Sequence, residues 1–251
     1  MPRFFFKLQY LGTPFSGWQR QPRNFTVQEC LEEHLQTQLG EKITLVASGR
    51  TDSGVHALGQ MIQFDLETRL CPQAIREKVN PCLPRSVLLS GGWIVNPKYH
   101  VIKSAVWKHY RYLLYRHGVR SPLYEDRAWV FNFPLDEAAM KEAAMALLGI
   151  HDFTSFRATD GSAATSERDL KKCRLRFNRD WIVFDLIANG FLKHMVRNIV
   201  GTLVDIGLHK KTADSIPRIL EAKNRAEAGR NAPPQGLYLM HVHYPKELFK
   251  G

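Results

Sequence analysis

The sequence is poor in cysteine, and the few cysteines that it has are scattered. Four occur in 251 residues, and none forms a CxxC pair or lies at zinc-ligand spacing from a histidine. This excludes a zinc ribbon and a disulfide scaffold and predicts reduced thiols. His241 and His243 share a face of the last expected strand, but no cysteine or carboxylate lies near them in sequence, so we expect no metal site. The cysteines are Cys30, Cys71, Cys82 and Cys173.

Long apolar runs are also missing. No stretch approaches the roughly 20 apolar residues of a membrane-spanning helix. The start, MPRFFFKLQY, lacks the apolar core and the cleavage site of a signal peptide. The phosphate-binding patterns GxxxxGK[ST] and GxGxxG are absent too. We therefore expect a cytoplasmic protein without either of these nucleotide-binding loops.

Acidic residues are outnumbered by basic ones. The 24 Asp and Glu stand against 35 Lys and Arg, which gives a formal net charge of +11. Such an excess favours an anionic partner, most commonly a nucleic acid, although it can also serve solubility alone.

The apolar pattern predicts two cycles of strands and helices. In the first cycle, Thr26 and Glu29 form the capping box of a helix that ends at Gly40. In the second cycle, Asp136 caps an alanine-rich helix that Gly149 ends. Strands are expected at about 4–9, 43–48, 60–67, 86–95, 107–116, 171–177, 181–188 and 236–244, and further helices at 71–84 and 191–207. We therefore expect an α+β protein of two similar halves, residues 1–103 and 104–251.

The helix expected at 191–207 is apolar on one half of its circumference. The other half holds Lys193, His194, Arg197, Asn198 and Asp205, with Gly201 beside them. This polar half is expected either to face solvent or to line a polar cleft. Gly201 would permit the close approach of another group.

The stretch ASGRTDSGVHALGQ, residues 47–60, contains one carboxylate, Asp52. Asp-Ser-Gly is common turn chemistry, and it is also the aspartic-protease tripeptide. That protease needs two carboxylates that share a proton, and the tripeptide occurs once here. A single aspartate can instead be a covalent nucleophile. It must stay ionised in a partly dry pocket, which predicts an arginine partner, either Arg50 or Arg197.

Basic residues gather with aromatic ones in two stretches. In KKCRLRF, alternation puts Lys172, Arg174 and Arg176 on one strand face. The second stretch, residues 98–116, interleaves lysines and arginines with Tyr99, Tyr110 and other aromatics. Unstacked RNA bases pack on aromatic rings while basic side chains hold phosphates, but a packed strand with solvated lysines gives the same pattern.

These pieces together resemble a family. GRTDSGVHALGQ is similar to the signature loop of the bacterial tRNA pseudouridine synthases of the TruA type, in which the loop holds the catalytic aspartate. Seven further blocks resemble that family in the same order, up to about residue 245. They are YLGTPFSGWQRQ, TVQECLE, VNPCLP, KHYRYLLY, HDFTSFRA, ANGFLKHMVRNIVGTL and PPQGLYLMHVHYP.

The resemblance implies both a fold and an activity. It implies two ferredoxin-like halves with joined antiparallel sheets, helices on one face and a basic central cleft. It implies a homodimer that isomerises uridine to pseudouridine at positions 38, 39 and 40 in the anticodon stem-loop of tRNA by base flipping. It also implies that no metal and no organic cofactor take part.

The resemblance also implies roles for individual residues. Asp52 would be the nucleophile, and Arg197 its ionic partner. Arg50 would help to extrude the target nucleotide, Tyr110 would pack on the uracil and relay a proton, and Leu237 would wall the pocket. Whether Asp52 attacks C1′ or the uracil ring stays open. The residues expected to contact tRNA are Tyr99, His100, Lys103, Lys172, Arg174 and Arg176.

Two segments depart from the family pattern. After TSFRA the family has polar or basic residues, whereas this chain has TDGSAATSE at residues 159–167, with Asp160 and Glu167. An F-H-A-R-like segment is replaced here by Tyr99, His100, Val101 and Ile102, so that Ile102 stands in place of the usual arginine. Both departures concern RNA contact rather than catalysis. The alternative is a non-catalytic RNA-binding protein on the same fold, but a carboxylate that faces phosphates costs such a binder affinity.

Overall fold

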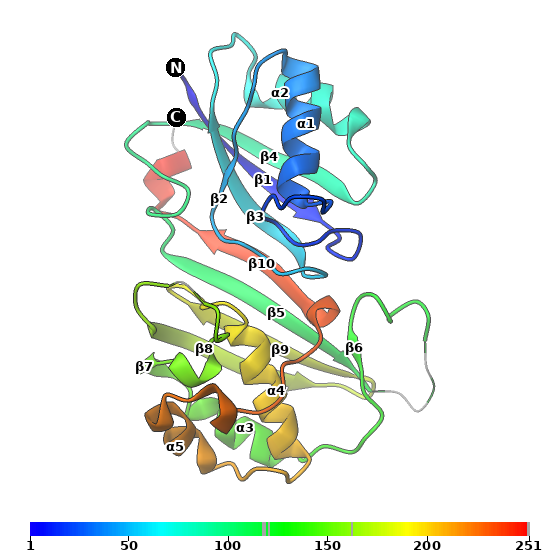
Figure 1. The fold of residues 1–251 in the computed structure, drawn as a ribbon, viewed down its shortest axis with the longest axis vertical. Coiled ribbons are helices and arrows are strands. Elements are labelled where there is room, and N and C mark those ends of the chain that lie inside the picture. Colours follow the sequence, from blue (N-terminus) through cyan, green and yellow to red (C-terminus); the bar gives the residue numbers. More distant parts are fainter. Residues whose placement is uncertain (117–118, 120, 162, 250–251) are drawn as a thin grey trace. The chain divides into compact units, whose positions relative to one another are not determined.

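Two units make up the fold, and the chain leaves the first unit and later returns to it. The computed structural model describes residues 1–116, 119, 121–161 and 163–249. The first unit comprises Met1–Val106 and Tyr238–Gly251, and the second comprises Trp107–Leu237 (Figure 1). The last strand of the chain therefore belongs mainly to the unit in which the chain begins.

The first unit is a sheet with the strand order β4-β1-β3-β10 and with β2 against β3. β1 pairs antiparallel with β3 and β4, β2 pairs antiparallel with β3, and β10 runs parallel to β3. The elements are β1 (Arg3–Tyr10), α1 (Val27–Leu39), β2 (Val46–Ala47), β3 (His56–Asp65), α2 (Pro72–Val79), β4 (Val87–Val95) and β10 (Leu237–His243).

Strand β1 is buried on both faces where it begins. Phe4, Phe5 and Phe6 have no exposed surface. The rings of Phe4 and Phe6 stack on Phe64 of β3, with centroids 5.6 and 5.5 Å away. Alternation puts Phe5 on the opposite face, where its ring meets Tyr244 edge-on at 5.8 Å. Consecutive phenylalanines thus supply apolar surface to both sides of this sheet.

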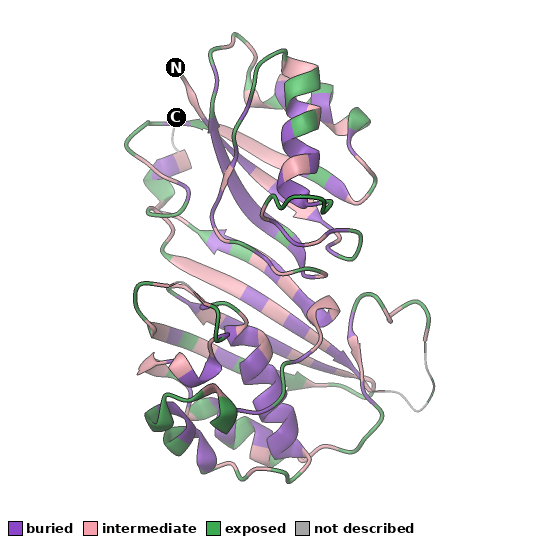
Figure 2. Ribbon diagram, in the orientation of Figure 1, coloured by how far each residue is buried: buried purple, intermediate pink, exposed green. Residues whose placement is uncertain are grey.

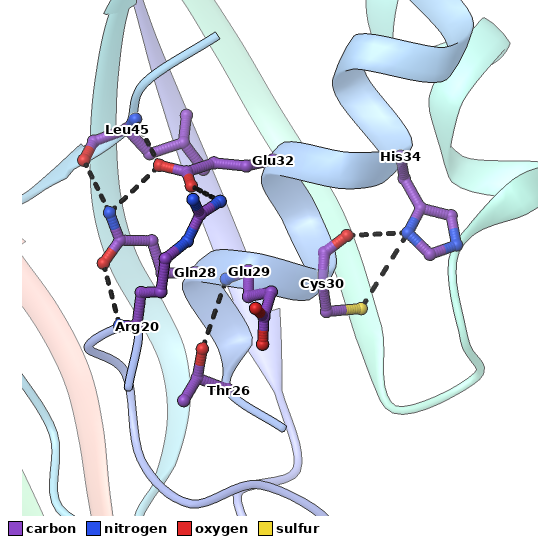
Figure 3. A network of polar contacts seen from close by, with 8 residues as sticks. All are labelled: Arg20, Thr26, Gln28, Glu29, Cys30, Glu32, His34 and Leu45. Carbon is purple, nitrogen blue, oxygen red and sulfur yellow. Dashed lines mark hydrogen bonds and ion pairs between the residues drawn. The ribbon is translucent and has the colours of Figure 1, made fainter. Parts of the chain in front are cut away.

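Two buried polar side chains of α1 bind neighbouring segments to the helix (Figure 3). The backbone N–H of Leu45 donates to the Glu32 carboxylate over 2.8 Å, and the Gln28 amide donates to the Leu45 carbonyl over 3.3 Å. The Arg20 guanidinium pairs with the same carboxylate. Since side chains take both backbone groups of Leu45, the strand expected over 43–48 is only Val46–Ala47.

The helix starts follow the predicted capping residues. The Thr26 hydroxyl accepts the N–H of Glu29, and Gly40 ends α1 in the left-handed region with a φ of 77°. The Asp136 carboxylate accepts two backbone N–H groups of the alanine-rich helix that follows it, both at 3.0 Å. These short-range predictions are confirmed. The predicted end of the alanine-rich helix at Gly149 is wrong, because the helix ends at Met145 and Gly149 begins a strand.

The second unit is a sheet with the strand order β5-β9-β8-β7 and with β6 beside β5. All pairs are antiparallel except β5 and β6, and the predicted hairpin of β8 and β9 is present. The sequence pattern misses β6, β7 and α5, because such short segments show too few periods. The elements are β5 (Trp107–Tyr115), β6 (Trp129–Val130), α3 (Glu137–Met145), β7 (Gly149–Asp152), β8 (Glu167–Phe177), β9 (Trp181–Ala188), α4 (Met195–Gly207) and α5 (Ser215–Ala222).

The polar half of α4 is covered largely by protein. Asn198 and Asp205 are both buried, and Figure 2 shows most of α4 as buried. Arg225 donates to the side chain of Asn198, and the backbone N–H of Arg230 donates to Asp205. The expectation that this half faces solvent or a cleft is therefore wrong for Asn198 and Asp205.

Both units combine helices with mostly antiparallel strands, which confirms the α+β fold class. Within the described ranges, no helix has the length and apolar character needed to cross a membrane.

Candidate active site

Asp52 lies on the loop that connects β2 to β3. The backbone N–H of Val55 donates to the Asp52 carbonyl over 3.2 Å, which closes a tight turn around Ser53 and Gly54. Strand β3 begins at His56, earlier than Gln60, where the sequence pattern places its start. The second half of the stretch 47–60 is therefore strand, and only the part around Asp52 is loop.

The segment between β1 and α1 holds this loop in place. The Trp18 backbone N–H donates to the Thr51 carbonyl over 3.0 Å, and the hydroxyls of Tyr10 and Thr51 lie 2.8 Å apart. The Ser53 hydroxyl donates to the Phe15 carbonyl over 3.2 Å. Burial raises the pKa of Tyr10 to about 12, while bonds to Thr51 and Gln60 act in the opposite direction. Residues on both sides of Asp52 are thus fixed by partners distant in sequence.

His56 and Gly12 form a second clamp on the loop. The Gly12 backbone N–H donates to Nδ1 of His56 over 3.0 Å, so this nitrogen acts as an acceptor. The His56 ring is buried and stacks on Tyr238 with centroids 4.6 Å apart. A Cβ atom at Gly12 would lie 2.1 Å from the Val55 carbonyl oxygen, so only glycine permits this approach.

Asp52 itself is half-buried, whereas Arg50 is exposed. The Gln60 side chain braces the preceding residues, because it donates to the Gly49 carbonyl and accepts from the Ser48 hydroxyl, both over 2.7 Å. The loop therefore presents one carboxylate and one guanidinium from a backbone with little freedom. This arrangement suits a positioned nucleophile or acid–base group.

Three of the predicted site residues belong to the second unit. Tyr110 of β5 is buried, and its ring meets Phe191 edge-on at 5.1 Å, shortly before α4 begins. Arg197 lies in the first turn of α4, and its Nε donates to the Ala232 carbonyl over 2.7 Å. Leu237 is buried at the end of this unit. Arg50 and Asp52 thus share a loop of the first unit, whereas Tyr110, Arg197 and Leu237 belong to the second.

Lys108 is a further candidate that the sequence analysis did not single out. It lies on the same face of β5 as Tyr110, because the two are separated by one residue of a strand. Burial lowers the pKa of the Lys108 ammonium to about 8, and the positive charge of Arg168 adds to this effect. Such perturbed groups occur frequently at functional sites.

The predicted tRNA-contacting residues are mostly accessible. Arg174, Arg176 and Lys103 are exposed, and Lys172, Tyr99 and His100 are half-buried. Arg176 is partly neutralised, because it lies 2.9 Å from the buried Asp185 carboxylate. The expected alternation in β8 is confirmed, since Cys173 and Leu175 are buried on the other face.

The described part of the chain contains no group of three or more His, Cys, Asp or Glu side chains that could hold a metal ion. The rings of His241 and His243 pack edge-on against each other, with centroids 4.3 Å apart.

Comparison with known proteins decides the family. The sequence model described as tRNA pseudouridine synthase matches residues 8–94 and 143–245. The chain belongs to the tRNA pseudouridine synthase family. It is 41% identical to tRNA pseudouridine synthase A of Colwellia psychrerythraea, over 98% of this chain and 95% of that protein. The proteins of the same name from Pseudoalteromonas atlantica and a Geobacter species are 41% and 40% identical, over 95% of this chain and 91% and 97% of theirs.

The match to the tRNA pseudouridine synthase family covers most of the candidate site. Arg50, Asp52, Arg197 and Leu237 lie within the matched ranges, whereas Tyr110 lies between them. The residues that sequence reasoning missed are those that hold the loop, above all Gly12 and His56. Their signal was present as a glycine in the loop after β1 and a histidine inside the Asp52 stretch, but no periodicity connects such distant positions.

Proposed function

We propose that the chain isomerises uridine to pseudouridine at positions 38, 39 and 40 in the anticodon arm of tRNA. Membership of the tRNA pseudouridine synthase family carries this proposal. The relatives are named tRNA pseudouridine synthase A, and they align with nearly the whole chain. The Asp52 loop lies within the matched residues 8–94, and the net charge of +11 suits a polyanionic substrate.

The proposed reaction rearranges one nucleotide without any co-reactant. The bond between N1 of uracil and C1′ of ribose breaks, and a bond between C5 and C1′ forms. The proton on C5 leaves and N1 gains a proton, so substrate and product are isomers. The uracil must first leave the base stack, because a stacked base cannot turn C5 toward C1′. The chemistry balances with no oxidant, metal or organic cofactor.

Asp52 is the proposed nucleophile. A carboxylate can form a covalent bond with the substrate, either at C1′ or on the uracil ring, and thereby divide a difficult step into two easier ones. The hydrogen bonds that Trp18 and Tyr10 make with Thr51 support this role, because they hold the residue next to Asp52. A nucleophile on a braced loop loses little rate to misplacement.

The other proposed site residues prepare Asp52 and the base for reaction. Arg197 pairs with Asp52 and keeps the carboxylate ionised, because a neighbouring guanidinium favours its charged form. Tyr110 packs on the uracil and relays a proton, and Leu237 walls the pocket. Arg50, exposed on the Asp52 loop, fills the place of the extruded base.

One tyrosine and five basic residues contact the tRNA in this proposal. Their aromatic rings and positive charges suit bases and phosphates, respectively. The proposed set is Tyr99, His100, Lys103, Lys172, Arg174 and Arg176.

The proposed architecture follows the family resemblance. Residues 1–103 form most of one ferredoxin-like half and residues 104–251 contain the other, with joined sheets, helices on one face and a basic central cleft. The segment Tyr238–Gly251 returns to the first unit. Two copies form a homodimer that binds tRNA in the cytoplasm, where tRNA is modified. The alternation of strands and helices within each unit supports this proposal.

The direct test is incubation of the purified chain with a uridine-containing tRNA transcript, followed by position-resolved mapping of pseudouridine. We expect pseudouridine at positions 38, 39 and 40 wherever the transcript has uridine. A matched transcript with cytidine at these positions should gain none. Tight binding of tRNA without any pseudouridine would favour a non-catalytic RNA-binding protein. Product elsewhere in the tRNA would contradict the assigned positions.

A further inference from the structure

Residues 225–237, called the strap below, follow α5 and run alongside α4 toward β10, as Figure 1 shows in orange. The strap contains only two short 3-10 turns, Arg225–Glu227 and Pro234–Gly236. Nothing in its sequence pattern predicts a fixed course. In the structure, hydrogen bonds to α4 and β5 nevertheless hold it along its length.

Three residues of α4, Asn198, Thr202 and Asp205, hold the first half of the strap. The Arg225 guanidinium donates to the buried Asn198 side chain over 2.9 Å. The Gly229 backbone N–H donates to the Thr202 hydroxyl over 2.8 Å. These contacts meet the face of α4 that the sequence pattern marks as polar, and they satisfy its buried polar groups.

Asp205 and Arg230 form the strongest of these contacts. The Asp205 carboxylate accepts the Arg230 backbone N–H over 3.0 Å and the Arg230 Nε over 2.7 Å. Nη2 of Arg230 lies 2.6 Å from Oδ1 of the same carboxylate. Because Asp205 is buried and the bond to the backbone fixes its direction, the pair defines the position of the strap at residue 230.

Gly201 permits this close approach. A Cβ atom at position 201 would lie 1.8 Å from the Arg230 carbonyl oxygen, which is far inside van der Waals contact. Any side chain there would push the strap outward. Gly201 is therefore one of the positions at which the backbone of the strap touches α4.

The strap then reaches Arg197 and binds it twice. The Ala232 backbone N–H donates to the Arg197 carbonyl over 3.1 Å, and Nε of Arg197 donates to the Ala232 carbonyl over 2.7 Å. The Tyr112 hydroxyl holds the next residue, because it donates to the Pro233 carbonyl over 2.8 Å. The Ala232 carbonyl thus fixes the rotation of the Arg197 guanidinium. The two Nη nitrogens of Arg197 are donors that can bind both oxygens of a carboxylate side by side.

We infer that the strap is a positioning element for the Arg197 guanidinium, and that Gly201, Asp205 and Arg230 act on the reaction through it. The inference rests on the proposed function, in which Arg197 pairs with Asp52. It adds that the pairing requires a guanidinium whose orientation is set by residues that never contact the substrate.

The test combines substitutions at Gly201 and Arg197 in single-turnover kinetics with saturating enzyme. Gly201→Ala should displace the strap and lower the rate by about 100-fold, the loss that a misplacement of about 1 Å can cause. The affinity for tRNA should stay within about threefold, because Gly201 is buried and lies outside the proposed set of tRNA contacts. Arg197→Lys, which removes the Nε donor, should lower the rate to a similar extent.

The double variant separates positioning from a merely structural role. If Gly201 acts through Arg197, adding Gly201→Ala to Arg197→Lys should lower the rate by less than about threefold further. Ala143→Gly, in the buried face of α3, serves as the matched control, since it destabilises the same unit without touching the strap. It should lower the unfolding midpoint and leave the rate unchanged.

Several outcomes would overturn the inference. A Gly201→Ala protein with the wild-type rate would do so while leaving the proposed function intact, provided that Arg197→Lys is slow. The inference would also be rejected if the rate losses of Gly201→Ala and Arg197→Lys multiplied in the double variant. It would likewise be rejected if Ala143→Gly lowered the rate as much as Gly201→Ala does. Full activity of Arg197→Lys would instead reject the proposed pairing itself. If Gly201→Ala does not fold, Arg230→Ala replaces it, because its side chain lies partly exposed at the rim of the strap.

Discussion

Asp185 lies directly between Arg111 and Arg174 in the register of the second sheet. Its buried carboxylate accepts bonds from His109, Arg111 and Arg176 at 2.7, 2.8 and 2.9 Å. Burial raises the pKa of Asp185, but the bonds from Arg111 and His109 outweigh burial and hold it below the usual range. At the scale of single residues, this carboxylate is structural: its partners account for both of its oxygens, and it organises a basic strand face.

Asp185→Asn should therefore lower the free energy of unfolding at pH 7 by about 2–3 kcal/mol, because the substitution leaves partly buried cations without their counter-charge. The exposure of Arg111 and Arg176 keeps the loss below that of a fully buried pair. Because the folded-state pKa is depressed, this stabilisation is complete above the unfolded-state value of about 3.9 and disappears as the pH falls through the folded-state value. Urea titrations across pH measure the difference.

The difference between wild type and Asp185→Asn should shrink below about pH 4. Glu142→Gln, an exposed substitution on α3, is the control. It should leave the free energy of unfolding unchanged across the same pH range. A difference that grows on acidification would contradict the assigned sign.

At the scale of elements, the sequence predicts those features that depend on residues close together in the chain. The caps of α1, the N-terminal cap of α3 and the hairpin of β8 and β9 follow from residues a few positions apart, and they are confirmed. Strand β2 is shorter than expected because α1 side chains bind Leu45. The helical wheel could not foresee that the strap covers Asn198 and Asp205, because the strap has no periodicity and lies more than twenty residues away.

The same limit applies to the candidate site. The choice of Asp52 as the only carboxylate of a glycine-rich loop came from composition and resemblance. The clamps on that loop could not be predicted, because Gly12 and His56 are 44 positions apart and meet only through the pairing of β1 with β3.

Gly12→Ala tests whether the contact between Gly12 and His56 supports the Asp52 loop. The added methyl group would meet the Val55 carbonyl oxygen, so we expect the free energy of unfolding to fall by about 1–3 kcal/mol. The single-turnover rate should fall at least about tenfold, since the Asp52 loop loses its support. Denaturant titration and pseudouridine formation measure the two effects.

Gly40→Ala is the matched control for that variant. Gly40 has a φ of 77°, so alanine is strained there, but no atom lies within 4 Å of the added Cβ. This variant should lose stability of about 1 kcal/mol and keep the wild-type rate. A normal rate in Gly12→Ala would show that the clamp serves folding alone.

At the scale of the whole molecule, the chain combines two α+β units with an excess of positive charge. The division after Val106 and the return at Tyr238 interrupt the simple order of two consecutive cycles. No sequence period shows that β10 runs beside β3. The charge, by contrast, is visible from composition alone, and its consequence for tRNA binding does not depend on details of the fold.

Binding of tRNA should weaken steeply with salt, because each neutralised phosphate releases counterions. Arg174→Ala should weaken binding and reduce the slope of log affinity against log salt by roughly 0.7–0.9, the contribution of about one phosphate contact. Lys42→Ala removes an equal charge from an exposed loop outside the proposed contact set and should leave the slope unchanged. Filter binding at several salt concentrations measures the slopes. Equal slopes for Arg174→Ala and wild type would remove Arg174 from the proposed contacts.

The central claim is that a single carboxylate, Asp52, performs the isomerisation, and Asp52→Asn tests it most directly. A tRNA transcript tritiated at C5 of uridine releases tritium to water only when C5 exchanges its proton for the bond to C1′. In single turnover, wild type should release the label from positions 38, 39 and 40. Asp52→Asn should bind the transcript within about threefold of the wild-type affinity and release none above background. Release by Asp52→Asn within about tenfold of the wild-type rate would contradict the assignment of Asp52 as the nucleophile.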